Sequence, residues 1–186
     1  MIISAAVDML LEEGFGGLSL RRLAARLGVK PASLYNHIDG VDDVRVGVAI
    51  RAAGALEAEL ISATEGREKG EAFVRACHAY RSFATNNPEL YRVYIASGML
   101  DDPRMLAAGK RSFSPIIELI RAFGLSDTDT LNFHRALRSA IHGYIELSNN
   151  GFLTRGGVSR DESYQIMIDE FLKLLENHHG KGGDEI

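Results

Sequence analysis

The chain has 186 residues and a formal net charge of −4; 46% of its residues are hydrophobic and only 4 are proline. This size and composition predict one or two globular domains with a substantial core and exclude a disordered chain. No apolar run approaches the roughly 20 residues that cross a bilayer, and the first residues lack the basic start and apolar centre of a signal peptide. The single cysteine, Cys77, cannot form an internal disulfide, so a cytoplasmic location is expected.

The spacing of apolar residues predicts helices in almost every segment, whereas strand-like alternation is scarce. The first helix ends at Gly14, and two short helices follow within residues 18–38. A fourth helix begins at Val41 and continues to a loop near residues 64–66. Further helices are expected over residues 71–84, 90–99, 105–123, 131–149 and 163–177, and Pro115 should kink or divide one of them. We therefore predict an all-α protein of about nine helices.

Residues 18–38, with the sequence LSLRRLAARLGVKPASLYNHI, carry the most informative local pattern. Gly28 follows the apolar face of the first helix and should end it, because glycine adopts a left-handed conformation without a Cβ penalty. Leu34 and Ile38 form the buried side of the second helix. Its outward side carries groups that hydrogen-bond to phosphates or base edges, namely Ser33, Tyr35, Asn36 and His37. This arrangement predicts a helix-turn-helix whose second helix enters the DNA major groove.

The same segment is locally basic. It has no acidic residue and a net charge of +4, which comes from Arg21, Arg22, Arg26 and Lys30. Positive charge that faces the phosphates favours DNA binding. Arginine is also common on solvated helix faces. The charge therefore supports DNA binding only together with the turn and the tyrosine-bearing second helix.

These residues resemble the DNA-binding domain of the tetracycline-repressor (TetR) family. The likeness also includes AA at 5–6, LLEEGF at 10–15 and GVDDV at 40–44. It implies an all-helical homodimer with a helix-turn-helix domain over residues 1–45 and a ligand-binding and dimerisation domain over residues 46–186. The implied function is that of a ligand-responsive transcriptional regulator, usually a repressor that a small molecule releases from a palindromic operator.

The resemblance assigns particular residues to DNA contacts. Arg21 matches a position that often reaches DNA, and the recognition-helix positions match Ala32, Ser33, Tyr35, Asn36 and His37. The Asn36 amide can pair with a base edge such as that of adenine, and the Ala32 methyl can touch a thymine methyl. The other three suit phosphate contacts that set the register. The Tyr35 ring is also expected to pack on the first helix of the motif, with its hydroxyl exposed.

Three features differ from the family pattern. Val41 begins the fourth helix where the family often has a basic residue, which removes a phosphate contact. Lys30 stands where a serine or similar helix cap is common, and we expect it to supply a DNA contact instead. The sequence begins directly in the first helix, without the basic arm that is common in the family.

A weaker resemblance covers residues 136–147, ALRSAIHGYIEL. It is similar to a TetR subgroup with a Trp-x-x-x-His-Gly signature, of which this chain keeps only His142 and Gly143. A glycine in mid-helix costs about 1 kcal/mol relative to alanine, so a close helix contact is expected at Gly143. His142 is expected either to contact the ligand or partner chain, or to be a hydrogen-bonded histidine inside the bundle.

Mostly apolar residues with a few polar groups on the later helices are candidates for the wall of a small-molecule pocket. The same residue types describe an ordinary core, and the sequence does not separate the two. Arg138 shares a helix face with His134, so it is expected to pair with an anionic ligand or with Glu146. The candidate set is Tyr80, Tyr91, Tyr94, Met99, Met105, Phe113, Ile117, His134, Arg138 and His142.

The helices near residues 131–149 and 163–177 have apolar faces broad enough for both a core and a homodimer interface. The scattered histidines offer no metal site, and no cofactor is expected. We expect no enzyme, because the sequence has no nucleophile–base pair, no paired carboxylates at a plausible cleft and no phosphate loop. The alternatives are a helical enzyme or carrier with a structural helix-turn-helix, and a module that acts chiefly through a protein partner. The differences at Val41 and before the first helix are what keep the second alternative open.

Overall fold

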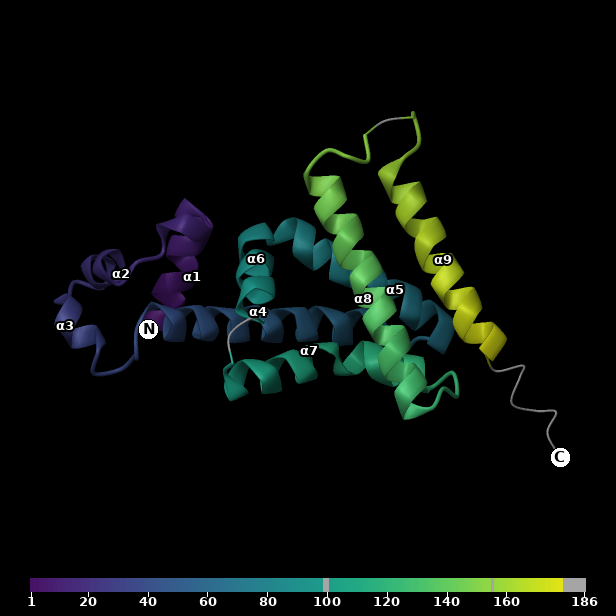
Figure 1. Cartoon of the computed structure of the whole chain (residues 1–186), viewed down its shortest axis with the longest axis horizontal. Helices are drawn as coiled ribbons and strands as arrows, with labels where there is room; N and C mark the ends of the chain where they lie inside the picture. The colour runs from purple at the N-terminus through teal and green to yellow at the C-terminus, as the bar shows by residue number, and fades with distance from the viewer. Residues whose placement is uncertain (99–100, 155, 179–186) are drawn as a thin grey trace. The chain divides into compact units, whose positions relative to one another are not determined.

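The structure, a computed structural model, describes residues 1–98, 101–154 and 156–178. Over these residues it contains nine α-helices, one short 3-10 helix and no strand (Figure 1). The elements are α1 (Ile2–Glu13), η1 (Phe15–Gly17), α2 (Leu20–Arg26), α3 (Pro31–Leu34), α4 (Val41–Thr64), α5 (Lys69–Asn86), α6 (Pro88–Ser97), α7 (Pro103–Arg121), α8 (Asp127–Asn149) and α9 (Arg160–His178). The predicted all-α fold is therefore confirmed.

The chain divides into two compact units. The first unit combines Met1–Glu57 with Asn86–Ser112, and the second combines Ala58–Thr85 with the chain from Phe113 onward. Helices α4 and α7 contribute residues to both units. The domain boundary expected after residue 45 lies within α4. It separates an expected DNA-binding role from an expected ligand-binding and dimerisation role, and it stays a prediction.

The first unit is organised around α1, which contacts α2, η1 and α6. Ala6 and Leu10 of α1 and Leu23 of α2 are fully buried. Gly47 of α4 lies against the Ile3 side chain, where any Cβ would collide with it. Each buried leucine stabilises the fold by about 1.5–3 kcal/mol, and the contacts with α1 fix the position of α2 and thus of the turn that follows.

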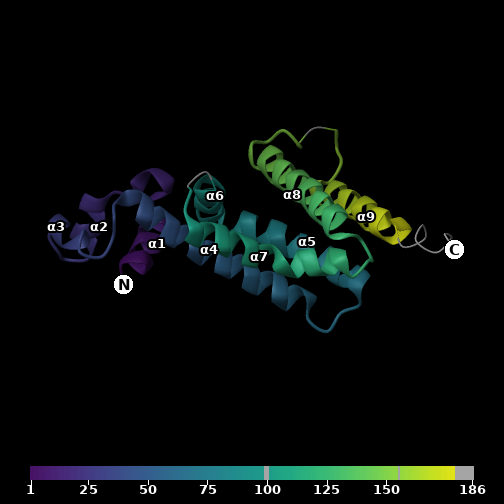
Figure 2. The same ribbon diagram turned by 60° about the horizontal axis from the view of Figure 1, so that its bottom comes forward.

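The second unit packs α5 against α8 and α9, which lie side by side as an antiparallel pair (Figure 2). The Phe133 ring of α8 lies 6.4 Å from the Phe73 ring and 5.5 Å from the Phe171 ring, so it joins all three helices. The Tyr164 hydroxyl of α9 donates a 2.6 Å hydrogen bond to the carbonyl of Cys77 in α5. The Cys77 thiol is fully buried, and burial raises its pKa, so it serves packing as a neutral group.

The helices from α5 to α9 all begin earlier than the apolar spacing predicts, and α8 and α9 differ the most. Helix α8 starts at Asp127 because Ser126 accepts a 3.1 Å hydrogen bond from the Asp129 backbone N–H, which caps the helix. Helix α9 starts at Arg160 with two acidic residues in its first turn, where the helix dipole favours them. These first turns are polar, so apolar periodicity does not reveal them.

Helix α7 is a single element through Pro115, so of the kink or division expected there, the division does not occur. The neighbouring side chains of Phe113 and Ile116 are buried, at 2% and 1% exposed, and this packing holds both sides of the proline in one helix. Within the part of the chain that the structure describes, no helix is both long enough and apolar enough to cross a bilayer.

Candidate functional sites

The turn between α2 and α3 has the geometry that its sequence predicts. The Ser19 hydroxyl accepts a hydrogen bond from the Arg22 backbone N–H and caps α2. At the other end, Val29 N–H bonds to the Ala24 carbonyl at 3.0 Å, and Gly28 N–H bonds to the Ala25 carbonyl at 3.1 Å. These two bonds form a Schellman motif, with Gly28 at a φ of +68°. The motif sets the direction in which the chain enters α3.

Helix α3 spans only Pro31–Leu34, so it is shorter than the predicted second helix, and residues 35–37 of the polar surface lie in the turn just beyond its end. Pro31 occupies its first turn, where the missing N–H costs nothing. Leu34 and Ile38 are 2% and 7% exposed and bury the opposite side, as predicted. The outward residues are all exposed and are called here the recognition cluster: Ala32, Ser33, Tyr35, Asn36 and His37. At 61% exposed, Tyr35 shows most of its ring to solvent and does not pack in the way that the sequence suggested.

The basic residues of the motif fall into two classes. Arg26 makes a two-pronged ion pair with Glu12 of α1, at 2.5 and 2.7 Å, and this hydrogen bonding lowers the pKa of Glu12. Arg22 pairs with Glu13. Arg21 and Lys30 are exposed and form no ion pair with any described residue. The local charge of +4 is therefore halved at the surface, because two acids that precede residue 18 in sequence neutralise two arginines.

The sequence interpretation missed a charged link between α4 and the start of α7, within the first unit. Arg104 Nη2 lies 2.6 Å from Asp43 Oδ1 and 2.7 Å from Asp102 Oδ2. Asp43 also accepts a 3.2 Å hydrogen bond from the Asp39 backbone N–H, at the turn that follows α3. Hydrogen bonds with Arg104 lower the pKa of Asp102 to about 2, so the Asp102 carboxylate stays ionised near neutral pH. Only the short run from Asp101 to Arg104 hinted at it.

In the second unit, four residues of the candidate ligand set meet at one interior cavity. They are Tyr80, Phe113, His134 and Arg138, joined by Ile116, Leu137 and Ile141. The Phe113 ring lies 5.4 Å from the Tyr80 ring and 5.2 Å from the His134 ring, and the Arg138 guanidinium lies 4.4 Å from the Phe113 centroid. The cavity is too narrow to admit a water molecule. Arg138 forms no ion pair with Glu146 among the described residues.

Two polar atoms on α8 are buried without a hydrogen-bond partner in the part of the second unit that the structure describes. They are Thr130 Oγ1 and His134 Nε2, and His134 lines the interior cavity. Burial, with smaller contributions from Arg138 and Arg135, lowers the pKa of His134 to about 4, so its ring is neutral at pH 7. A buried polar group without a partner costs about 1–3 kcal/mol, which a ligand that supplied the partner would recover.

The other members of the candidate set lie elsewhere. Tyr91, Tyr94 and Met105 are buried in the first unit, where the Tyr94 hydroxyl lies 2.9 Å from the Ser112 hydroxyl. His142 and Ile117 are half-buried, and Ile116, one residue before Ile117, lines the interior cavity. Met99 lies outside the described residues. The close contact expected at Gly143 is wrong for this chain: a Cβ there would meet no described atom within 4 Å.

Comparison with known proteins agrees with this arrangement. A sequence profile for bacterial regulatory proteins of the tetR family matches residues 2–38, and one for the tetracyclin repressor-like C-terminal domain matches residues 73–171. The HTH-type transcriptional regulator Rv0681 of Mycobacterium tuberculosis is 30% identical over 98% of this chain and 83% of its own length.

Solved structures share the fold over nearly the whole chain. A protein of Rhodococcus sp. RHA1 has a TM-score of 0.80 at 24% identity, covering 94% of this chain and 93% of that one. A TetR variant of Acinetobacter baumannii AYE in complex with minocycline has a TM-score of 0.70 at 17% identity, covering 96% of both chains.

A helix-turn-helix with an exposed polar recognition helix, joined to a helical second unit, defines the class of DNA-binding transcriptional regulators. The chain belongs to the TetR family. Members of this family are typically regulators, which bind operator DNA, dimerise and bind small molecules, and are typically not enzymes.

Proposed function

We propose that the protein acts in the cytoplasm as a repressor, that it binds a palindromic operator as a homodimer, and that a small molecule bound in the second unit releases it. The observation that carries the DNA half of this proposal is the recognition cluster. Its five side chains stand on a capped, packed turn with Arg21 and Lys30 exposed nearby. Four of the five side chains are polar, and a buried apolar face holds them in place, which is what groove recognition needs.

Each part of the cluster has a role in this proposal. Asn36 reads a base edge, while Ser33, Tyr35 and His37 fix the register through phosphates. Arg21 and Lys30 supply the salt-dependent attraction. In a homodimer the two recognition helices would stand roughly 34–36 Å apart, one DNA turn, so the operator would repeat at that spacing as a palindrome.

The α8–α9 pair supports a homodimer interface over residues 131–149 and 163–177. Over the residues that the structure describes, it leaves four large apolar side chains exposed: Leu131 at 45%, Leu147 at 48%, Ile166 at 56% and Leu174 at 62%. The open space beside Gly143 would let a second backbone approach closely. Four helices across a twofold axis would bury these residues together.

The interior cavity supports the effector half of the proposal. Its wall is aromatic and aliphatic, and the partnerless Nε2 of His134 is the polar group that a ligand would satisfy. The ligand would therefore be an apolar, ring-sized molecule with one hydrogen-bonding group. Because the cavity has no room even for water, the ligand must bind a conformation in which the cavity is wider, and it would shift the DNA-binding equilibrium by its preference for that conformation. Moving the population from 1:99 to 99:1 requires a preference of about 5.5 kcal/mol.

The first experiment titrates the protein against labelled DNA from its own upstream region at two salt concentrations. Saturable binding to one short palindrome, weaker at the higher salt, is expected. The double variant Arg21→Ala with Tyr35→Ala should lose this binding. The control Arg75→Ala, on α5 and paired with Glu71, should keep it. Binding no stronger than to a random duplex, or equal binding by both variants, would refute the operator proposal.

The second experiment screens small molecules for release of that DNA. An effector should raise the thermal midpoint of the wild-type protein and fail to do so in His134→Leu, which removes the hydrogen-bonding ring. An effector that acts equally on both proteins would bind elsewhere.

A further inference from the structure

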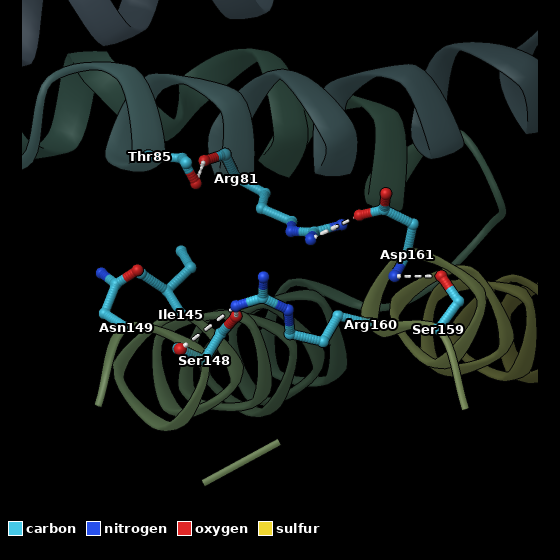
Figure 3. Close-up of a pocket in the computed structure, with 8 residues that line it drawn as sticks. All are labelled: Arg81, Thr85, Ile145, Ser148, Asn149, Ser159, Arg160 and Asp161. Carbon is cyan, nitrogen blue, oxygen red and sulfur yellow. Dashed lines mark hydrogen bonds and ion pairs between the residues drawn. The ribbon is translucent and has the colours of Figure 1, made fainter. Parts of the chain in front are cut away.

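A second, chemically different pocket lies in the second unit, between α5, the last turns of α8 and the first turn of α9 (Figure 3). It has a volume of about 300 Å³, and every residue that lines it except Ile145 is polar or charged. It shares no lining residue with the interior cavity. Its volume is at the lower end of the range for small-molecule sites.

Arg81 forms one wall of this polar pocket and is held rigidly. Its side chain is only 19% exposed, and its guanidinium lies 4.6 Å from the centroid of the Tyr164 ring and 5.7 Å from that of the Tyr144 ring. Asp161 pairs with it at 2.7 Å. An arginine that packs against two neighbouring aromatic rings keeps its planar donor edge oriented, which makes it a prepared site for an oxyanion.

Arg160 lies on the other side of the pocket from Arg81 (Figure 3). Its Nη1 atom reaches the Ser148 carbonyl at 3.5 Å and the Ser148 hydroxyl at 3.4 Å, at the end of α8. Both distances are long for hydrogen bonds, so Ser148 holds the guanidinium only weakly. A charged group that came between the two arginines would form shorter contacts.

The charge of the lining favours an anion. Two guanidinium groups face one carboxylate, which leaves a local charge of +1 in a chain whose total is −4. Like charges that share a pocket repel each other, and an oxyanion relieves this repulsion through charge-assisted, two-pronged hydrogen bonds. The Asn149 amide and the Thr85 and Ser159 hydroxyls add neutral hydrogen-bonding groups around the same space.

We propose that this polar pocket binds a small organic anion through a carboxylate or phosphate group placed between Arg81 and Arg160. The bound group would connect α5, α8 and α9, the three helices that supply the lining. This proposal does not depend on operator binding or on the interior cavity. Its ligand would carry a negative charge, whereas the effector proposed for the interior cavity is mostly apolar.

The test uses the whole protein without DNA. Because the chain has no tryptophan, its tyrosine emission is visible, and Tyr144 and Tyr164 lie against Arg81. Sodium phosphate and sodium acetate are titrated separately against sodium chloride of the same ionic strength. At least one oxyanion should change the emission saturably while chloride does not, and the stronger of the two identifies a phosphate or a carboxylate as the preferred group.

Two variants with opposite expected effects make the test specific. Arg160→Gln should weaken binding by about tenfold or more, because it removes a charge-assisted contact. Asp161→Asn should tighten binding, because it removes the competing carboxylate. Arg121→Gln breaks an exposed pair with Asp127 outside the pocket and should bind like the wild type. Absence of saturable binding to both oxyanions would overturn the proposal, as would equal affinity of Arg160→Gln, Asp161→Asn and the wild type.

Discussion

In the first unit the candidate functional side chains stand on the surface of a local motif, whereas in the second unit they line the narrow interior cavity. The recognition cluster, Arg21 and Lys30 all lie within residues 21–37, and their scaffold is buried beneath them. The lining of the interior cavity comes from α5, α7 and α8, over residues 80–141. A substitution at the surface site should therefore change binding and spare folding, while one at the cavity should change folding first.

The largest effect should come from Phe113→Ala. This side chain is 2% exposed and contacts Tyr80, His134 and Arg138. Removing a buried phenylalanine costs about 3–5 kcal/mol of unfolding free energy, which urea denaturation will measure. The fraction that stays folded should bind operator DNA as the wild type does. The control Leu106→Ala, on the same helix and 63% exposed, should change stability by about 0.5 kcal/mol or less.

The next effect is a dependence of stability on pH that originates at His134. Burial lowers its pKa to about 4 in the folded state, against about 6.5 when unfolded. Between these values the unfolded chain binds a proton that the folded chain does not, so stability falls as the pH drops from 6.5 towards 4. At about 1.4 kcal/mol per pKa unit, the loss reaches roughly 3 kcal/mol.

Denaturation at several pH values measures this slope, and His134→Leu should flatten it. At pH 7 the same variant should be no less stable than the wild type, because it also removes the partnerless Nε2 atom. If His134→Leu kept the full slope, the pH dependence of stability would come from other groups.

The helix-turn-helix and the interior cavity differ in how well the sequence predicts them. The helix-turn-helix could be read directly, because Gly28, Leu34 and the polar residues around them act through neighbours within a few positions. In the sequence Arg22 and Arg26 both count as positive charges available to DNA. The sequence does not show that α1 brings Glu12 and Glu13 against them.

The interior cavity shows more clearly what cannot be predicted from the sequence. Residue types suggested Tyr80 and Tyr91 equally, yet only packing between distant helices assigns Tyr80 to the cavity and Tyr91 to the first unit. The polar pocket had no sequence signal, because Arg81 and Arg160 are 79 positions apart. Helical periodicity reports which face of a helix is buried, and it does not report which other helix covers that face.

A smaller effect is expected for Arg21→Ala on the salt dependence of DNA binding. A phosphate contact contributes about 0.9 to the slope of log K against log salt. A homodimer that loses one such contact in each subunit should therefore show a slope whose magnitude is smaller by about 1.8. Electrophoretic or fluorescence titration at four salt concentrations measures it. An unchanged slope would show that Arg21 does not reach the phosphates.

The smallest effect should come from Arg26→Ala, which removes the same charge five residues later in the same motif. Arg26 is paired with Glu12, so its charge is already neutralised in the free protein, and exposed pairs of this kind add little to stability. We expect a slight decrease in the unfolding midpoint. The slope of log K against log salt should not change, and it is measured beside Arg21→Ala in the same DNA titration. A slope reduced as much as in Arg21→Ala would mean that Arg26 leaves Glu12 for a phosphate when DNA binds. The surface site would then be formed partly by the DNA, and the contrast between a ready-made surface and a cavity that must widen to bind would be weaker.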